Sequence, residues 1–202
     1  MTDKAHNLSP VLLVISGPAG VGKTTLCERL TERFPDEISR AVTCTTRPPR
    51  ANEENGRDYF FLSRDEFERG IANGDFLEYA RVHTNLYGVR HAQVRDCLNA
   101  GKNVLLNLDV QGAATVRKLA QADPFLQKAL VSVFIMPKCI DELRCRLAGR
   151  GTDAPDEVER RMCVAQTEMC RCDEYDYCIV SGSREEDFAK ILEIYESAKA
   201  RA

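Results

Sequence analysis

One short segment near the start of the chain constrains its fold more than any other. The residues Gly17-Pro-Ala-Gly-Val-Gly22-Lys23-Thr24 place four residues between two glycines and follow them with lysine and threonine. An apolar run precedes this segment, and a helical pattern follows it. A strand, a glycine-rich turn and a helix N-terminus in this order point backbone N–H groups and the positive end of a helix dipole at one anion. The segment therefore predicts a phosphate-binding loop.

The residue types in this loop indicate a bound nucleoside triphosphate. Lys23 can reach the β and γ phosphates, and Thr24 offers the kind of hydroxyl that holds Mg²⁺. The alternative is a tight strand-to-helix turn with an incidental lysine. The motif does not identify a second substrate, because motors, GTPases and kinases share it. The predicted triphosphate-binding residues are Gly17, Pro18, Ala19, Gly20, Val21, Gly22, Lys23 and Thr24.

Apolar runs alternate with amphipathic helical patterns along much of the chain. Such alternation predicts an α/β fold with a parallel sheet covered by helices on both faces, the three-layer core of a phosphate-binding-loop NTPase. The strands expected in this core are Val11–Ser16, Asn103–Leu108, Ala129–Ile135 and Tyr177–Val180. The helices expected are Lys23–Phe34, Arg64–Asn73, His91–Ala100, Gln111–Ala120, Ile140–Arg150, Pro155–Cys172 and Glu185–Ala200.

Three features mark helix ends within this pattern. Ser63 and Glu66 have the spacing of a capping box, Gly101 suits a left-handed C-terminal cap, and Pro155 suits a first helical turn.

Between the first helix and Asn103 the sequence pattern changes to short strand-like runs, which indicate an inserted lobe at about 41–90. The runs are Ala41–Thr45, Asp58–Leu62, Phe76–Val82 and Leu86–Arg90. We expect one domain over 1–202, because no repeat or low-complexity linker divides it.

Composition and charge exclude several classes of protein. A net charge of −3 argues against a general nucleic-acid binder, which needs a basic face. No run approaches the ~18 apolar residues of a membrane span, so we expect a cytoplasmic protein without a membrane partner. The nine cysteines are an odd number outside a short secreted framework, which favours reduced thiols. A zinc site at Cys163, Cys170, Cys172 and Cys178 is the alternative, although the paired spacing typical of zinc is missing.

The inserted lobe carries a second set of motifs. They are Thr43-Cys-Thr-Thr-Arg47-Pro-Pro-Arg50, Asn55-Gly-Arg-Asp-Tyr59-Phe-Phe, Phe76-Leu-Glu78-Tyr and Leu86-Tyr87-Gly88. With the phosphate-binding loop, with Asp109-Val-Gln111-Gly112 and with the arginines at 146–161, they closely resemble the guanylate kinase family from about Val11 onward. This resemblance implies phosphoryl transfer from ATP to GMP, with ATP bound by 17–24 and Mg²⁺ held by Thr24. It implies no particular oligomeric state.

The chemistry of the lobe residues agrees with an acceptor site. Prolines stiffen the loop between Arg47 and Arg50, whose guanidinium groups can fork onto one phosphate. Glu78 lies in an apolar stretch, where a carboxylate needs a partner, and guanine N1–H and N2–H₂ both donate to one carboxylate whereas adenine N1 does not. An exposed strand position is the alternative for Glu78. The resemblance implies GMP contacts by Thr43, Arg47, Arg50, Tyr59, Glu78, Tyr87 and Asp109.

Catalysis of this transfer needs cations more than a base. A phosphate monoester has its second pKa near 6, so its oxygen is already an anionic nucleophile at neutral pH. The difficulty is to bring two polyanions together in line, which positive charge relieves. The resemblance implies a mobile lid at about 146–161, although an arginine-rich helix is often only a solvated face. The predicted catalytic residues are Lys23, Arg47, Arg146, Arg150 and Arg161.

Three positions depart from the family pattern. Val89 replaces a hydroxyl residue that commonly helps bind guanine, Asn107 replaces an acidic residue two positions before Asp109, and Ser181-Gly182 replaces an asparagine near the adenine. Asp109 itself suits a metal-water or acceptor contact, and a helix cap is the alternative. Two rival functions follow: a kinase of similar fold with another acceptor, and a peptide-binding scaffold module. The intact phosphate-binding loop argues against the scaffold module.

Overall fold

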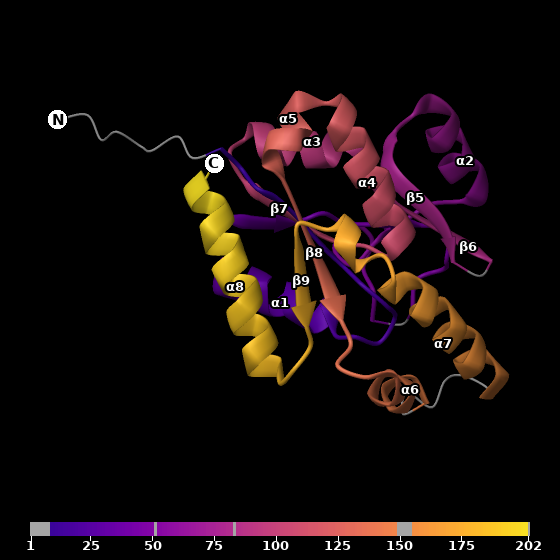
Figure 1. The fold of residues 1–202 in the computed structure, drawn as a ribbon. Coiled ribbons are helices and arrows are strands. Elements are labelled where there is room, and N and C mark those ends of the chain that lie inside the picture. The colour runs from indigo at the N-terminus through magenta and orange to yellow at the C-terminus, as the bar shows by residue number, and fades with distance from the viewer. Residues whose placement is uncertain (1–8, 51, 83, 149–154, 202) are drawn as a thin grey trace.

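A computed structural model describes residues 9–50, 52–82, 84–148 and 155–201 of the 202-residue chain (Figure 1). Its elements, in chain order, are β1 (Leu12–Ser16), α1 (Lys23–Arg33), β2 (Ile38–Arg40), β3 (Cys44–Thr45), β4 (Phe60–Phe61), α2 (Arg64–Asn73), β5 (Phe76–Val82), β6 (Asn85–Arg90), α3 (His91–Asn99), β7 (Asn103–Asn107), α4 (Val110–Ala122), α5 (Pro124–Ala129), β8 (Leu130–Met136), α6 (Ile140–Ala148), α7 (Pro155–Met169), the 3₁₀ turn η1 (Cys172–Glu174), β9 (Tyr177–Val180) and α8 (Arg184–Arg201).

The core is a parallel sheet with the strand order β2-β7-β1-β8-β9. Successive β1 residues alternate between the two faces: Leu12 and Val14 pack into one apolar cluster, and Leu13 and Ile15 into the other. Helices α3, α4 and α5 cover the first face, and α1 and α8 cover the second (Figure 1). The predicted three-layer α/β core with a parallel sheet is confirmed.

The strand order also locates the site. The chain leaves β1 toward α1 on one face of the sheet and leaves the neighbouring strand β7 toward α4 on the other. A crevice forms at the carboxyl ends of two such neighbouring strands, where the direction of winding reverses. The parallel register pairs Ile15 with Asn107, so the loop after Ser16 and the loop after Asn107 begin side by side.

Residues 44–90 form a second sheet in the order β4-β3-β6-β5, drawn with α2 at one side of the core in Figure 1. Helix α2 has the predicted bounds and the predicted capping box, because Ser63 accepts from the Glu66 N–H and Glu66 accepts from the Ser63 N–H. Phe67 is fully buried under this sheet and stacks on Phe76 with ring centroids 4.3 Å apart. The lobe therefore has its own small core.

Several element bounds differ from the sequence expectation. Strands β3 and β4 are two residues each and shorter than expected, and Ala129 ends α5 instead of beginning β8. The edge strand β2 and the six-residue helix α5 were not predicted. Asp123 caps α5 by accepting from the Phe125 and Leu126 N–H groups, which explains why a helix this short forms. Gly101, which follows the C-terminal cap residue Ala100 of α3, has φ +75°, as predicted for a left-handed cap.

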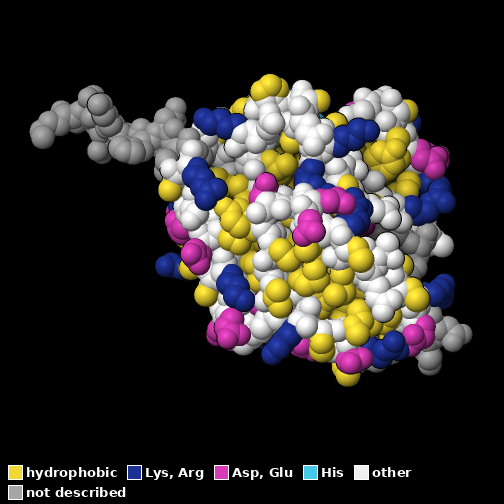
Figure 2. Space-filling view, in the orientation of Figure 1, with side chains coloured by type: hydrophobic (Ala, Val, Ile, Leu, Met, Phe, Trp, Pro, Cys, Tyr) yellow, Lys and Arg dark blue, Asp and Glu magenta, His cyan; other side chains and the backbone are white. Residues whose placement is uncertain are grey.

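Helices α6 and α7 pair through Leu143, Val158, Met162 and Ala165. The described part of α7 begins at Pro155, as predicted. On the face drawn in Figure 2, the described cationic and anionic side chains are interspersed without a broad basic area, and apolar side chains gather where β8 and β9 end. Among the described residues, no helix has both the length and the apolar character needed to cross a membrane.

Gly17 tests how tightly the loop after β1 is held. It has φ +136°, and a Cβ at this position would lie 2.4 Å from the Ile135 carbonyl oxygen, a backbone atom of β8. Gly101→Ala is the matched control, because Gly101 also has a positive φ but nothing within 4 Å of its added Cβ. We expect the control to cost about 1–2 kcal/mol and Gly17→Ala to cost roughly 3–4 kcal/mol. Urea unfolding measures both, and equal losses would contradict the close approach.

Candidate functional site

The loop after β1 is wound around its own lysine. Gly17, Gly20 and Gly22 have φ values of +136°, +87° and +107°, which L residues with a side chain rarely adopt. The Lys23 ammonium donates to the Gly17 carbonyl at 2.5 Å and to the Pro18 carbonyl at 2.9 Å. The loop and the first turn of α1 line a pocket of about 680 Å³ together with Arg29, Gly182, Arg184 and Asp187. Six of the eight predicted triphosphate-binding residues, 19–24, therefore line this pocket.

Gly182, one of the two residues of Ser181-Gly182 that depart from the family pattern, lines this pocket. The Asp187 carboxylate is buried and accepts from the Ser181 hydroxyl and the Gly182 N–H, both at 2.7 Å. A buried carboxylate with two donors is satisfied. The residues that replace the family asparagine therefore hold an ordered turn at the start of α8.

A second, smaller pocket of about 220 Å³ lies between the lobe and the carboxyl end of β7. Five predicted acceptor residues line it: Thr43, Tyr59, Glu78, Tyr87 and Asp109. Glu78 and Tyr87 come from the paired strands β5 and β6, and Asp109 follows β7. Thr43 and Tyr59 come from the chain just before β3 and β4, respectively. The structure thus gathers residues up to 66 positions apart, as the sequence motifs predict.

Glu78 is buried, and the alternative of an exposed strand position is wrong. Its exposed fraction is 5%. Burial, with a further contribution from the negative charge of Asp109, raises the pKa of Glu78 to about 8. A Cβ on Gly112 would lie 2.7 Å from Glu78 Oε2, so only glycine leaves room for this carboxylate. The group sits in the pocket as an acceptor without a full set of donors.

Val89 is the partner of Glu78 in the β5–β6 pair, and its apolar side chain packs in the core and lines the pocket. The hydroxyl that this position commonly provides is therefore absent. Asp109 caps α4 by accepting from the Gly112 N–H at 2.7 Å through Oδ1. The cap alternative is therefore realised, and a carboxylate with a second oxygen can still contact a ligand.

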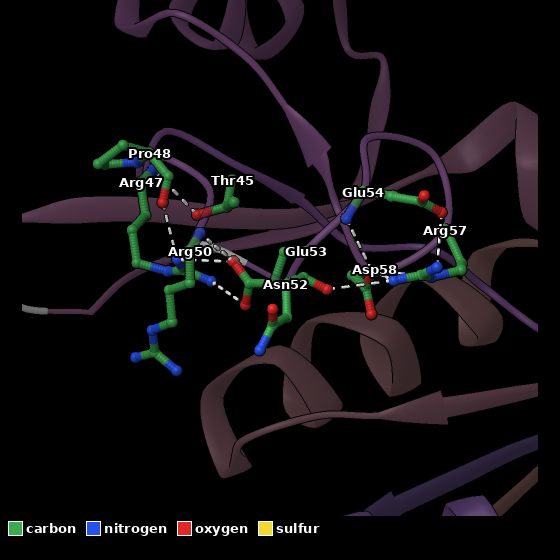
Figure 3. Close-up of polar contacts among 9 residues, drawn as sticks. All are labelled: Thr45, Arg47, Pro48, Arg50, Asn52, Glu53, Glu54, Arg57 and Asp58. Atoms are coloured by element: carbon green, nitrogen blue, oxygen red, sulfur yellow. Dashed lines mark hydrogen bonds and ion pairs between the residues drawn. The ribbon is translucent and has the colours of Figure 1, made fainter.

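Arg47 lies at the rim of this pocket. Its guanidinium carbon is 5.4 Å from the Tyr59 ring centroid and 5.9 Å from that of Phe61, within cation–π range. The hydrogen-bonded Glu53 carboxylate, with a smaller contribution from the nearby Tyr87 hydroxyl, raises the pKa of Arg47 above its ordinary value. Arg50 is exposed, and Figure 3 shows its guanidinium pointing away from Glu53. Neighbouring side chains thus hold the guanidinium of Arg47, whereas that of Arg50 is exposed.

Asn107 joins the two pockets. It lines the acceptor pocket, and its side-chain amide donates to the Thr24 hydroxyl of the donor loop at 3.2 Å. This bond takes one lone pair of the Thr24 oxygen and leaves the other, so the hydroxyl fits a role as a cation ligand. No group of three or more His, Cys, Asp or Glu side chains in the described ranges could hold a metal ion by itself.

The predicted lid is described only in part. Arg161 is half-buried on α7. Arg146 belongs to α6, but its side chain lies outside what the structure describes, and so does all of Arg150. Arg144 forms an ion pair with Glu159 across the α6–α7 pair. The catalytic roles of the lid arginines stay predictions.

Sequence reasoning missed three residues at this site. Gly112 was quoted only as part of a motif, and Glu53 was not singled out. Glu168 on α7 is half-buried, and burial raises its pKa while the nearby positive charge of Lys23 lowers it and the negative charge of Asp109 raises it. The one available signal was for Glu53, a carboxylate three residues after Arg50 in an arginine-rich loop.

Fold and site together define a class of protein: a kinase with a phosphate-binding loop and a separate lobe for its phosphate acceptor. A family model described as guanylate kinase matches residues 9–198. A guanylate kinase of Wolbachia sp. subsp. Brugia malayi (strain TRS) is 40% identical over 191 residues, covering 95% of this chain and 94% of that protein. One from Dechloromonas aromatica (strain RCB) is 45% identical over 170 residues, covering 84% and 80%.

A solved structure agrees with these relatives. The crystal structure of guanylate kinase from Anaplasma phagocytophilum matches with a TM-score of 0.72 at 33% identity, covering 95% of this chain and 87% of that one. The chain belongs to the guanylate kinase family, which confirms the resemblance seen in the sequence.

The raised pKa of Glu78 predicts a pH-dependent stability. The folded-state pKa of about 8 lies above the unfolded value near 4.3, so the folded state binds the extra proton between these values. This contribution is full below about pH 4.3 and is lost as the pH rises toward 8. Glu78→Gln removes it, so the stability of the variant relative to the wild type should grow by on the order of 1 kcal/mol per pH unit, about 2–4 °C.

Thermal unfolding at pH 5.5, 6.5 and 7.5 measures this difference. Glu54→Gln is the surface control, because Glu54 is exposed on the same lobe. A constant difference between Glu78→Gln and the wild type over this range would show that Glu78 is ionised in the folded protein throughout.

Proposed function

We propose that this protein transfers the γ-phosphoryl group of ATP to GMP. The observation that carries the proposal is the shared wall between the two pockets: Thr24 of the donor loop hydrogen-bonds Asn107 of the acceptor pocket. Two phosphate-bearing ligands on either side of this pair are neighbours. Such proximity is the main requirement of phosphoryl transfer, because the enzyme has little covalent chemistry to perform.

Glu78 supports guanine as the acceptor base. When ionised, its carboxylate accepts from N1–H and N2–H₂ of guanine, which provides the donors that the pocket lacks. Adenine offers a lone pair at N1, so it leaves the buried carboxylate unpaired, a mismatch that discriminates by roughly 10⁴-fold. Thr43 and Asp109 line the same pocket and are proposed to contact the base beside it.

The remaining residues are proposed to serve the phosphates. Arg47, Arg50, Tyr59 and Tyr87 bind the acceptor phosphate, and the amides of 17–24 with Lys23 bind the donor. A GMP phosphate oxygen forms a bond to the γ-phosphorus while the bond from that phosphorus to the β–γ bridging oxygen breaks and ADP leaves. No proton has to be removed, because the acceptor phosphate is largely a dianion above pH 6. Arg146, Arg150 and Arg161 neutralise the charge that spreads over the group in transfer.

Mg²⁺ bound at Thr24 would supply positive charge between the donor phosphates. This requirement, a cytoplasmic location and the lack of a nucleic-acid partner stay predictions from the sequence. One observation, the missing hydroxyl at Val89, favours an acceptor other than GMP. An assay with several nucleoside monophosphates distinguishes GMP from such an acceptor.

A coupled ADP-release assay over a panel of nucleoside monophosphates tests the proposed function. GMP should exceed AMP, CMP and UMP in kcat/KM by at least about 10³-fold. Lys23→Ala should lower the turnover number by about 10²–10³-fold, because it removes charge from the transferring group, with GMP affinity changed less than about twofold. Lys118→Ala, an exposed lysine on α4, is the matched control. Equal rates with GMP and AMP would refute the guanine assignment.

The proton on Glu78 predicts a pH-dependent base affinity. Below pH 8 the carboxyl group holds a proton that has to leave before the group accepts both guanine hydrogen bonds, so affinity should rise with pH and approach tenfold per unit. Guanosine is the probe, since it lacks the phosphate that titrates near pH 6. Titrations at pH 6, 7 and 8 should show this rise for the wild type and a flat, weak response for Glu78→Gln. A flat response for the wild type would contradict the proposal.

A further inference from the structure

The Glu53 carboxylate accepts three hydrogen bonds in the loop that carries Arg47 and Arg50 (Figure 3). Its Oε1 accepts from Arg47 Nη2 at 2.8 Å, and its Oε2 accepts from Arg47 Nη1 at 3.0 Å and from the Arg50 N–H at 2.8 Å. Both side chains are mostly covered, with exposed fractions of 16% for Arg47 and 17% for Glu53. The pair is therefore an organised bidentate contact and not a loose surface ion pair.

The contact uses only one edge of the guanidinium. One hydrogen on each Nη atom goes to Glu53, and the second Nη1 hydrogen goes to the Pro48 carbonyl at 2.7 Å. The Nε–H and the second Nη2–H lie side by side on the adjacent edge of the planar fork, and neither donates to Glu53 or Pro48. Two parallel donors on one edge match two oxygens of a phosphate. Glu53 therefore does not occupy the Nε/Nη2 edge, which is the edge proposed to bind the acceptor phosphate.

The same carboxylate also shapes the backbone that carries both arginines. The Arg50 N–H donates to Glu53, and in return the Glu53 N–H donates to the Arg50 carbonyl at 3.0 Å. These reciprocal bonds join the Arg50 backbone to Glu53. Arg47, through its guanidinium, and Arg50, through its backbone, are therefore both tied to one side chain.

Aromatic rings hold the opposite side of Arg47. Tyr59 and Phe61 lie within cation–π range of its guanidinium, and Tyr59 also lines the acceptor pocket. Hydrogen bonds from Arg47 and then from Arg50 lower the pKa of Glu53, so its carboxylate stays ionised at neutral pH. The guanidinium is thus held at its plane by rings and at one edge by an anion.

We propose that Glu53 is a positioning residue, which holds the Arg47 side chain and the Arg50 backbone in the geometry that receives the acceptor phosphate. The inference rests on the proposed function and deepens it, because it names the residue that prepares the phosphate subsite before the substrate arrives. Binding is tighter when ligand-contacting side chains are already ordered, since their rotamer freedom is not lost on association. Glu53 touches neither the reacting atoms nor the base and acts through Arg47.

The experiment compares GMP with guanosine, whose difference isolates the phosphate subsite. Calorimetric or fluorescence titrations at pH 7.5 give the dissociation constants of wild type, Glu53→Gln, Glu53→Asp and Glu54→Gln. Glu54 is the matched control, because it lies next to Glu53 but pairs with Arg57 at 2.5 Å. For Glu53→Gln we expect GMP to bind about tenfold more weakly and guanosine within twofold of the wild type. Glu53→Asp, which keeps the charge, should recover part of the loss.

Steady-state kinetics supply the second readout. KM for GMP should rise about tenfold in Glu53→Gln while KM for ATP stays within twofold, and Glu54→Gln should change neither. Unchanged GMP binding in Glu53→Gln would overturn the proposal. Tighter GMP binding would also overturn it, because Glu53 would then compete with the phosphate for Arg47. Equal weakening of GMP and guanosine would also overturn it in favour of general support of the lobe. Failure of the wild type to bind GMP would instead refute the proposed function.

Discussion

The pairing of β1 with both β7 and β8 is the constraint on which the rest of the structure depends. Because β1 and β7 run parallel and in register, the phosphate-binding loop and the segment Asn107–Asp109 emerge side by side. The pairing of β1 with β8 brings the Ile135 carbonyl against Gly17 and fixes where that loop turns. Both pockets are consequences of these hydrogen-bonded ladders, which are buried between two apolar clusters and have little freedom to shift.

The acceptor pocket is organised by two carboxylates that play opposite electrostatic parts. Glu53 is paired with a guanidinium, and its pKa is lowered; Glu78 is buried beside another acid, and its pKa is raised to about 8. The first arrangement fixes a cation beside the pocket, and the second keeps an acid inside it whose charged form is disfavoured. A site for a nucleotide needs both, because its phosphate is an anion and the guanine edge is a donor.

Sequence patterns predicted the core where the physical signal is local. Helix α2 was predicted with its bounds, because its cap pairs Ser63 with Glu66 over three residues, and the loop 17–24 was predicted because its glycines permit one kind of turn. The edge strand β2 escaped prediction, since three residues carry no periodicity. Asp123 before Pro124 was a usable signal for α5 that the short length of the helix concealed.

Contacts between distant residues could not be read from the sequence. The motifs named most residues of the acceptor pocket but not the bond between Asn107 and Thr24, which lie 83 positions apart. Burial of Glu78 depends on the missing Cβ of Gly112, on an element that the lobe does not contain. The contact of Glu53 with Arg47 could not be predicted, because it depends on how the loop folds. The roles of Arg146 and Arg150 concern side chains outside the described residues and remain predictions.

The partition between the pockets is a neutral amide, and this has a consequence for how two bound ligands influence one another. Asn107 contributes a dipole but no net charge, so it does not shield a phosphate on one side from a phosphate on the other. Any repulsion between phosphates across so thin a partition has to be offset by cations, which include Lys23 on the donor side and Arg47 on the acceptor side. By thermodynamic reciprocity, whatever effect the first ligand has on the affinity of the second is returned equally.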